Sequence, residues 1–170
     1  MERVYSFIGD FASRADAKNR VVLPSAFKRE LESEGNECAQ PTETQEGAKG
    51  GARLVIKKDL FEQCLIIYPY SVWEKMMSDL RGRIDPYNRR HSQFLREFQR
   101  NTSEVALDGN GRILIPQRLL DLIGAGKELT FLGIDDHIEL WNTETYDNQA
   151  LSGEALGELA DSIFGNEGDK

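Results

Sequence analysis

The sequence contains little that would support metal binding or insertion into a membrane. Its 170 residues include two cysteines and two histidines, and no apolar run approaches the roughly 18 residues that a membrane span needs. Cys38 and Cys64 form no C-x-x-C pair and have no histidine at a ligand spacing. We therefore expect no metal, no other cofactor and no membrane contact. Two reduced thiols are expected, with a disulfide as the alternative.

Residues that enzymes commonly use do not occur at recognisable spacings. His91 lies in a basic segment and His137 at the start of an expected strand, and neither has a partner at a catalytic spacing. Gly109 and Gly111 resemble part of a phosphate-binding loop, but no third glycine and no Lys-Ser/Thr pair follows. We expect neither catalysis nor a small-molecule substrate. The first residues lack a signal-peptide core, so a cytoplasmic location is expected.

Positive charge is also scarce, but its distribution matters more than its total. The formal net charge is −8, and residues 144–170 contain seven acidic residues against one lysine. The chain ends in Gly, Asn, Glu, Asp and Lys, a composition typical of disorder, so we expect a disordered acidic tail at 151–170. The remainder is nearly balanced, and the net charge therefore does not exclude a nucleic-acid partner.

A nine-residue segment occurs twice, at 16–24 and 108–116, a constant offset of 92 residues. Asp, Arg and Pro are identical in the two copies, and three aliphatic positions match. Each copy predicts a strand, a tight turn, a second short strand stopped by proline, a helix and a hairpin. The expected ranges are strands at 7–14 and 103–107, helices at 24–33 and 116–123, and hairpins at 53–68 and 127–141.

The repeat predicts an α+β protein, mainly β, with four segments. The first repeat covers 10–72 and carries a polar surface insertion at 35–51. A helical joiner covers 73–101, with a break between two helices at Gly82 and Pro86. The second repeat covers 102–145, and the acidic tail follows. The apolar residues around the start of the joiner are expected to pack in the core or between subunits: Val72, Trp73, Met76, Met77 and Leu80.

The geometry of a tight turn explains most of the residues that the two copies share. Asp16 and Asp108 can accept backbone N–H bonds across the turn. Asn19 and Gly111 suit the left-handed conformation that such a reversal needs. The arginine that follows each turn, Arg112 in the second copy, can fold back onto the aspartate. It can instead project outward as a hydrogen-bond donor to a ligand.

Positive charge distinguishes the two copies. The first copy carries Arg14, Lys18, Arg20, Lys28 and Arg29 around its turn and following helix, and the second has Ala106, Asn110, Arg112, Leu120 and Asp121 there. A turn exposed only to solvent does not need this one-sided enrichment. A surface that meets a polyanion does, because neutralised phosphates and released counterions supply most non-specific affinity. The first turn is therefore the candidate site for a polyanion such as a nucleic acid.

The D-x-K-x-R-V-V-L-P element resembles the swapped-hairpin motif of AbrB-like regulators. Two copies in one chain, the joiner sequence at 85–90, and the Leu-Ile-Ile-Tyr-Pro run at 65–69 before Trp73 are similar to the MraZ family. The resemblance implies AbrB-like repeats with interleaved hairpins closing a small β-barrel, and ring-shaped homo-oligomers on the nucleoid. It implies repression at short direct repeats upstream of the division and cell-wall gene cluster that includes the family member's own gene.

The family's DNA contacts map onto Lys18 and Arg20, with Arg14, Lys28 and Arg29 as neighbours. A different hypothesis stays open: AbrB-like folds also serve as toxin antidotes, in which an acidic tail binds a protein partner. The arginines of the joiner leave two alternatives as well, a second DNA-facing stripe or a contact between subunits.

Overall fold

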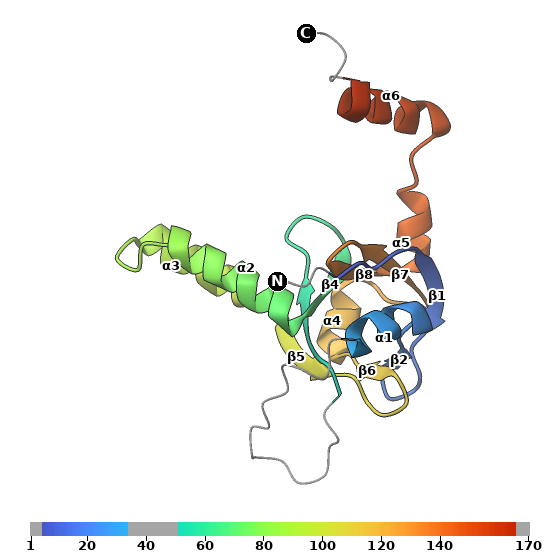
Figure 1. Cartoon of the computed structure of the whole chain (residues 1–170), viewed down its shortest axis with the longest axis horizontal. Helices are drawn as coiled ribbons and strands as arrows, with labels where there is room; N and C mark the ends of the chain where they lie inside the picture. The colour runs from blue at the N-terminus through green and yellow to red at the C-terminus, as the bar shows by residue number, and fades with distance from the viewer. Residues whose placement is uncertain (1–4, 34–50, 166–170) are drawn as a thin grey trace.

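The same order of elements occurs twice along the chain. The computed structural model describes residues 5–33 and 51–165, and these form eight strands and six helices of an α+β fold dominated by strands (Figure 1). The first set is β1 (Asp10–Arg14), β2 (Arg20–Val22), α1 (Ser25–Glu32), β3 (Arg53–Lys58), β4 (Cys64–Pro69) and α2 (Tyr70–Arg83). After α3 (Arg89–Gln99), the second set is β5 (Thr102–Ala106), β6 (Arg112–Leu114), α4 (Gln117–Leu122), β7 (Glu128–Ile134), β8 (His137–Asn142) and α5 (Thr143–Asn148). Helix α6 (Gly153–Phe164) follows.

The two sets exchange strands. The larger sheet is antiparallel and has the order β1-β7-β8-β4-β3-β5, so β1 of the first set pairs with β7 of the second, and β3 pairs with β5. The short strands β2 and β6 form a separate two-stranded antiparallel ribbon. This pairing agrees with the interleaving that the family resemblance implies. Neither sheet closes on itself, so the closed barrel is not confirmed.

The core lies where the ribbon, the larger sheet and the helices α1 and α4 meet. Val21 and Ile113, the central residues of the ribbon strands, are fully buried, and so are Phe27 of α1 and Leu119 of α4. Both helices begin directly after a proline, whose fixed φ suits entry into a helix. The apolar positions of the repeated segments therefore build one core that both repeats share.

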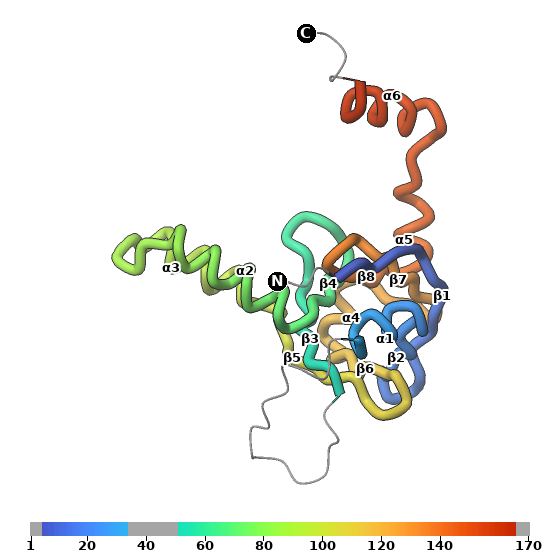
Figure 2. The backbone as a smooth tube through the Cα atoms, viewed as in Figure 1, coloured from blue at the N-terminus to red at the C-terminus, as the bar shows by residue number. Residues whose placement is uncertain are grey.

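Helices α2 and α3 form an arm that projects away from this body (Figures 1 and 2). Trp73 stacks on Phe98 at its base, with ring centroids 6.0 Å apart. Lys57 of β3 is buried there, and its Nζ donates a hydrogen bond to the carbonyl oxygen of Phe98. The expected break between the helices is present, but α2 continues through Gly82 to Arg83, so Gly82 does not end the helix. The turn at Pro86 separates α2 from α3.

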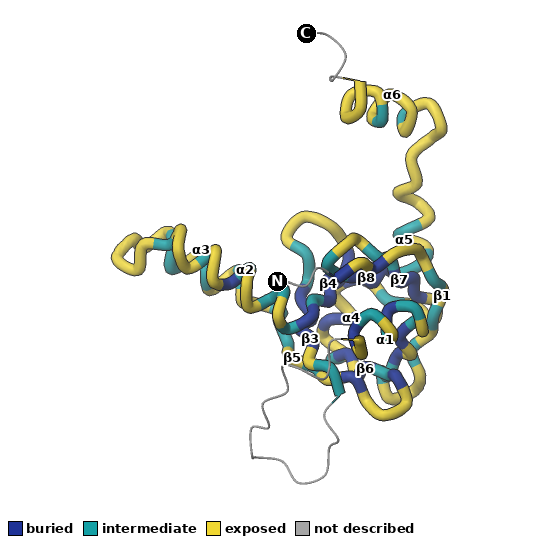
Figure 3. Tube along the Cα trace, viewed as in Figure 1, coloured by how far each residue is buried: buried dark blue, intermediate teal, exposed yellow. Residues whose placement is uncertain are grey.

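The expected disordered tail is wrong for residues 153–164, which form helix α6. Its apolar residues Leu156, Leu159 and Ile163 recur at helical spacing and are exposed, and the Ser152 hydroxyl caps the helix by accepting from the Ala155 N–H. The high acidity of the segment hid this periodicity. Figure 3 shows α6 and the arm as the most exposed helical parts. The predicted insertion residues 35–50 and tail residues 166–170 lie outside the described residues.

Gly133 of β7 is a position where the fold leaves no room for a side chain. A Cβ on Gly133 of β7 would lie 2.5 Å from the carbonyl carbon of Phe7, because the N-terminal segment crosses β7 there. Gly133→Ala should lower the free energy of unfolding by about 1–3 kcal/mol, measured by urea denaturation. Gly109→Ala is the control, since a Cβ there meets nothing within 4 Å, and should change stability by less than about 0.5 kcal/mol. Equal stability of both variants would contradict this packing.

Candidate nucleic-acid interface

The first turn is held by one carboxylate. The Oδ1 atom of Asp16 accepts hydrogen bonds from the backbone N–H groups of Lys18 and Arg20, each at 2.9 Å. Its Oδ2 atom accepts from the Nε of Arg20 at 2.8 Å. The arginine thus folds back onto the aspartate, which was one of the two roles expected for it. Within the described structure, Nε is the one guanidinium nitrogen of Arg20 that bonds to Asp16.

The second turn repeats this arrangement residue for residue. Asp108 accepts from the backbone N–H groups of Asn110 and Arg112 at 2.9 and 2.8 Å, and from the Nε of Arg112 at 3.1 Å. The two turns also share their left-handed residue, with φ of +62° at Asn19 and +72° at Gly111. Asparagine is therefore able to take the place of glycine in the first turn.

The pKa values of both turn aspartates lie below their ordinary value. The largest cause is the hydrogen bond from the backbone N–H of the arginine four residues later, Arg20 for Asp16 and Arg112 for Asp108. These bonds favour the ionised carboxylate. The charged forms of the aspartates thus stabilise the turns.

The ribbon places the two turns at opposite ends. The Asn19 carbonyl accepts from the Ile115 N–H, and the Gly111 carbonyl accepts from the Leu23 N–H, both at 2.9 Å. The Asn19 Nδ2 also donates to Gln117 at the start of α4, at 2.9 Å. Each turn therefore lies against the helix of the other repeat.

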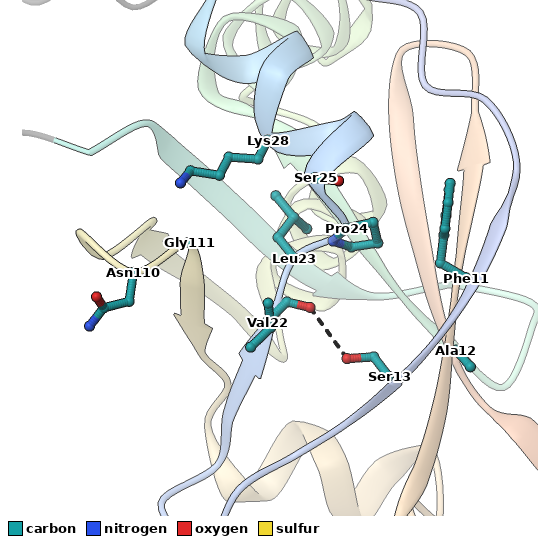
Figure 4. Close-up of a pocket in the computed structure, with 10 residues that line it drawn as sticks. All are labelled: Phe11, Ala12, Ser13, Val22, Leu23, Pro24, Ser25, Lys28, Asn110 and Gly111. Carbon is teal, nitrogen blue, oxygen red and sulfur yellow. Dashed lines mark hydrogen bonds between the residues drawn. The ribbon is translucent and has the colours of Figure 1, made fainter.

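This exchange divides the basic residues that the sequence grouped around the first turn. Lys28 of α1 lies over the second turn: a Cβ on Gly111 would be 3.2 Å from the Cδ of Lys28. Figure 4 shows the Lys28 side chain extending above Gly111 and Asn110. Lys18 remains on the first turn and is exposed. The two lysines thus lie at opposite ends of the ribbon.

The remaining predicted residues lie beside these turns. Arg14 pairs with Glu128 at 3.1 Å, but both side chains are more than 60% exposed, so the pair contributes little to stability. Lys28 lies 3.7 Å from Glu32, and Arg29 is exposed on α1. These contacts leave the cations accessible to a ligand.

A pocket of about 530 Å³ opens beside the second turn. Phe11, Val22, Lys28 and Gly111 contribute to its lining, and the Ser13 hydroxyl donates to the Val22 carbonyl at 3.3 Å at its edge (Figure 4). Among the described residues, no group of three or more His, Cys, Asp and Glu could hold a metal ion. No described helix is both long and apolar enough to span a bilayer.

Two apolar residues on the ribbon are not among the residues predicted from the sequence. Val22 and Leu114 are 55% and 58% exposed, on the face opposite the buried Val21 and Ile113. The period of two along each strand could have indicated them. Only the pairing of β2 with β6 brings them onto one surface.

The exchanged hairpins and the paired turns define a protein built from two swapped-hairpin repeats. A family model described as "MraZ protein, putative antitoxin-like" matches residues 98–156. "Transcriptional regulator MraZ" of Phocaeicola vulgatus is 35% identical, covering 94% of each chain. The protein of that name from Bacteroides thetaiotaomicron is 35% identical over 95% of this chain and 94% of its own, and that from Clostridium acetobutylicum is 30% identical over 82% and 84%. The chain belongs to the MraZ family.

The turn aspartates predict a loss of stability in acid. Their lowered pKa values mean that this stabilisation is complete above the unfolded-state value of 3.8 and is lost as the pH falls through the lower folded-state values. Asp16→Asn with Asp108→Asn keeps an acceptor oxygen but removes the titrating groups. The double variant should lose less stability than the wild type between about pH 5 and pH 2.5, measured by urea denaturation. Identical acid dependence of the two proteins would show that other carboxylates dominate.

Proposed function

We propose that the protein is a sequence-specific DNA-binding transcriptional regulator without catalytic activity. It acts in the cytoplasm, on the nucleoid, as a repressor at short direct repeats upstream of a division and cell-wall gene cluster that includes its own gene. The names of its relatives support transcriptional regulation. We assign the DNA site from the difference in charge between two turns whose hydrogen bonds are otherwise alike.

Lys18 and Asn110 occupy equivalent positions. Each donates its backbone N–H to the turn aspartate at 2.9 Å, and each side chain is exposed. The turn geometry is therefore independent of the lysine ammonium group. An exposed charge that the fold does not use is available for a phosphate. We assign the DNA contacts to Lys18, Arg20, Arg14, Lys28 and Arg29.

Self-association into a ring completes the proposal. The chain exposes large apolar side chains on projecting elements, including Leu156 and Ile163 of α6 at 57% and 66% and Phe94 of α3 at 44%. Contacts between copies would remove such surface from water. Several copies would also present identical turns to evenly repeated DNA boxes, which raises avidity without new contacts.

Lys18→Ala should weaken binding to a DNA fragment from upstream of the protein's own gene. Loss of one phosphate contact should also reduce the dependence of log affinity on log salt by about one per bound copy. Asn110→Ala is the matched control in the second turn and should change neither quantity. Both are measured by fluorescence anisotropy at several salt concentrations. An unchanged affinity of Lys18→Ala would place the DNA contacts away from the first turn, and equal losses in the two variants would place contacts on both turns.

Light scattering tests self-association directly. At micromolar concentration the protein should have a mass several times its monomer mass of 19.2 kDa. A mass that stays at the monomer value would rule out the ring.

A further inference from the structure

The outer face of the ribbon carries a regular pattern of arginine and aliphatic side chains. In the antiparallel register, Arg20 lies opposite Leu114, and Val22 lies opposite Arg112. The residues between them, Val21 and Ile113, are fully buried. Side chains alternate between the two faces of a strand, so the four outer residues share one surface. Each aliphatic side chain therefore has an arginine as its cross-strand neighbour.

The aspartates hold these arginines without using up their donors. The Nε of Arg20 bonds to Asp16, and the Nε of Arg112 bonds to Asp108. A guanidinium has five N–H donors, so the terminal nitrogens of each can still donate to a ligand. The carboxylate also fixes the orientation of each guanidinium, which reduces the entropy lost on binding.

The dimensions of the ribbon match those of B-form DNA. Outward-facing residues of one strand are about 6.8 Å apart, since a strand rises about 3.4 Å per residue. Two base-pair steps cover roughly the same length, at about 3.4 Å per step. The strands lie about 5 Å apart, and a two-stranded ribbon fits the major groove, which is about 12 Å wide.

The cations beside the ribbon suit a polyanion on both sides of such a groove. Lys18 lies on the turn at one end and Lys28 over the turn at the other end. Neither end depends on these ammonium groups for its backbone hydrogen bonds. Two cations that flank an apolar and arginine-bearing centre are complementary to two phosphate backbones that flank base edges.

We propose that the outer face of the β2–β6 ribbon enters the major groove and that Val22 and Leu114 contact the C5-methyl groups of thymines. The thymine methyl group is displayed in the major groove, where aliphatic side chains recognise it. The terminal nitrogens of the two arginines donate to neighbouring base edges. This inference rests on the proposed DNA binding and names the residues that distinguish bases within it.

The test removes methyl groups either from the DNA or from the protein. The fragment from upstream of the protein's own gene is prepared once with thymine and once with uracil, which lacks only the C5-methyl group. The wild-type protein should bind the uracil fragment more weakly, by about fourfold for each methyl group contacted. Val22→Ala with Leu114→Ala should bind the thymine fragment more weakly than the wild type does, and should bind the two fragments equally.

The other outcomes overturn the inference in distinguishable ways. If the wild type binds both fragments equally, DNA binding stands and methyl recognition fails. If the double variant remains as sensitive to uracil as the wild type, the methyl contacts lie elsewhere. If the double variant instead loses oligomer mass in light scattering, the two side chains lie between subunits. If the wild type binds neither fragment, the proposed function fails as well. Thermal melting confirms folding, because substitutions at exposed sites change stability by less than about 0.5 kcal/mol.

Discussion

The pairing of β2 with β6 is the interaction on which the rest of the structure depends. Its two end bonds, from the Leu23 N–H to Gly111 and from the Ile115 N–H to Asn19, join each repeat to the turn of the other. The pair buries Val21 and Ile113 completely. Neither repeat could form this ribbon alone, because each supplies one strand. The duplication therefore yields a single cooperative unit rather than two independent domains.

The exchange has a consequence for charge that the linear order of residues conceals. Lys28 lies six residues after Val22, the last residue of its own ribbon strand, yet it covers Gly111 of the other repeat. The first repeat supplies Lys18 at one end of the ribbon and Lys28 at the other. The second repeat supplies the scaffold of its turn without a lysine, and Asn110 stands there instead. The first repeat therefore carries most of the positive charge around the turns, while both repeats contain the turn itself.

Local chemistry explains which features could be predicted from the sequence. The turn needs an acceptor, a left-handed residue and a proline stop, so Asp16, Asn19 and Pro24 indicated it without any tertiary information. The helices after the prolines and the two hairpins follow from periodicity for the same reason. Contacts between repeats, such as Asn19 with Gln117, could not be predicted, since they depend on which strands exchange. The order of the larger sheet depends on that exchange too.

The difference between the expected tail and the observed helix α6 has a physical cause as well. The acidic composition predicts a disordered tail where helix α6 lies, because it conceals the helical spacing of Leu156, Leu159 and Ile163. The break expected at Gly82 and Pro86 does lie between α2 and α3, although α2 extends one residue past Gly82 to Arg83. The closed barrel that the family resemblance implies is not confirmed, because the ribbon and the larger sheet remain two separate sheets. Composition and single residues are weaker guides than periodicity when the two disagree.

The central claim is that DNA lies against the paired turns and their ribbon rather than against the arm formed by α2 and α3. Photo-crosslinking to DNA in which 5-iodouracil replaces thymine, followed by mass spectrometry of the attached peptides, measures this directly. We expect crosslinks to peptides that contain the first turn, the ribbon strands or α1. Crosslinks confined to residues 70–99, which carry the arginines of the arm, would contradict it.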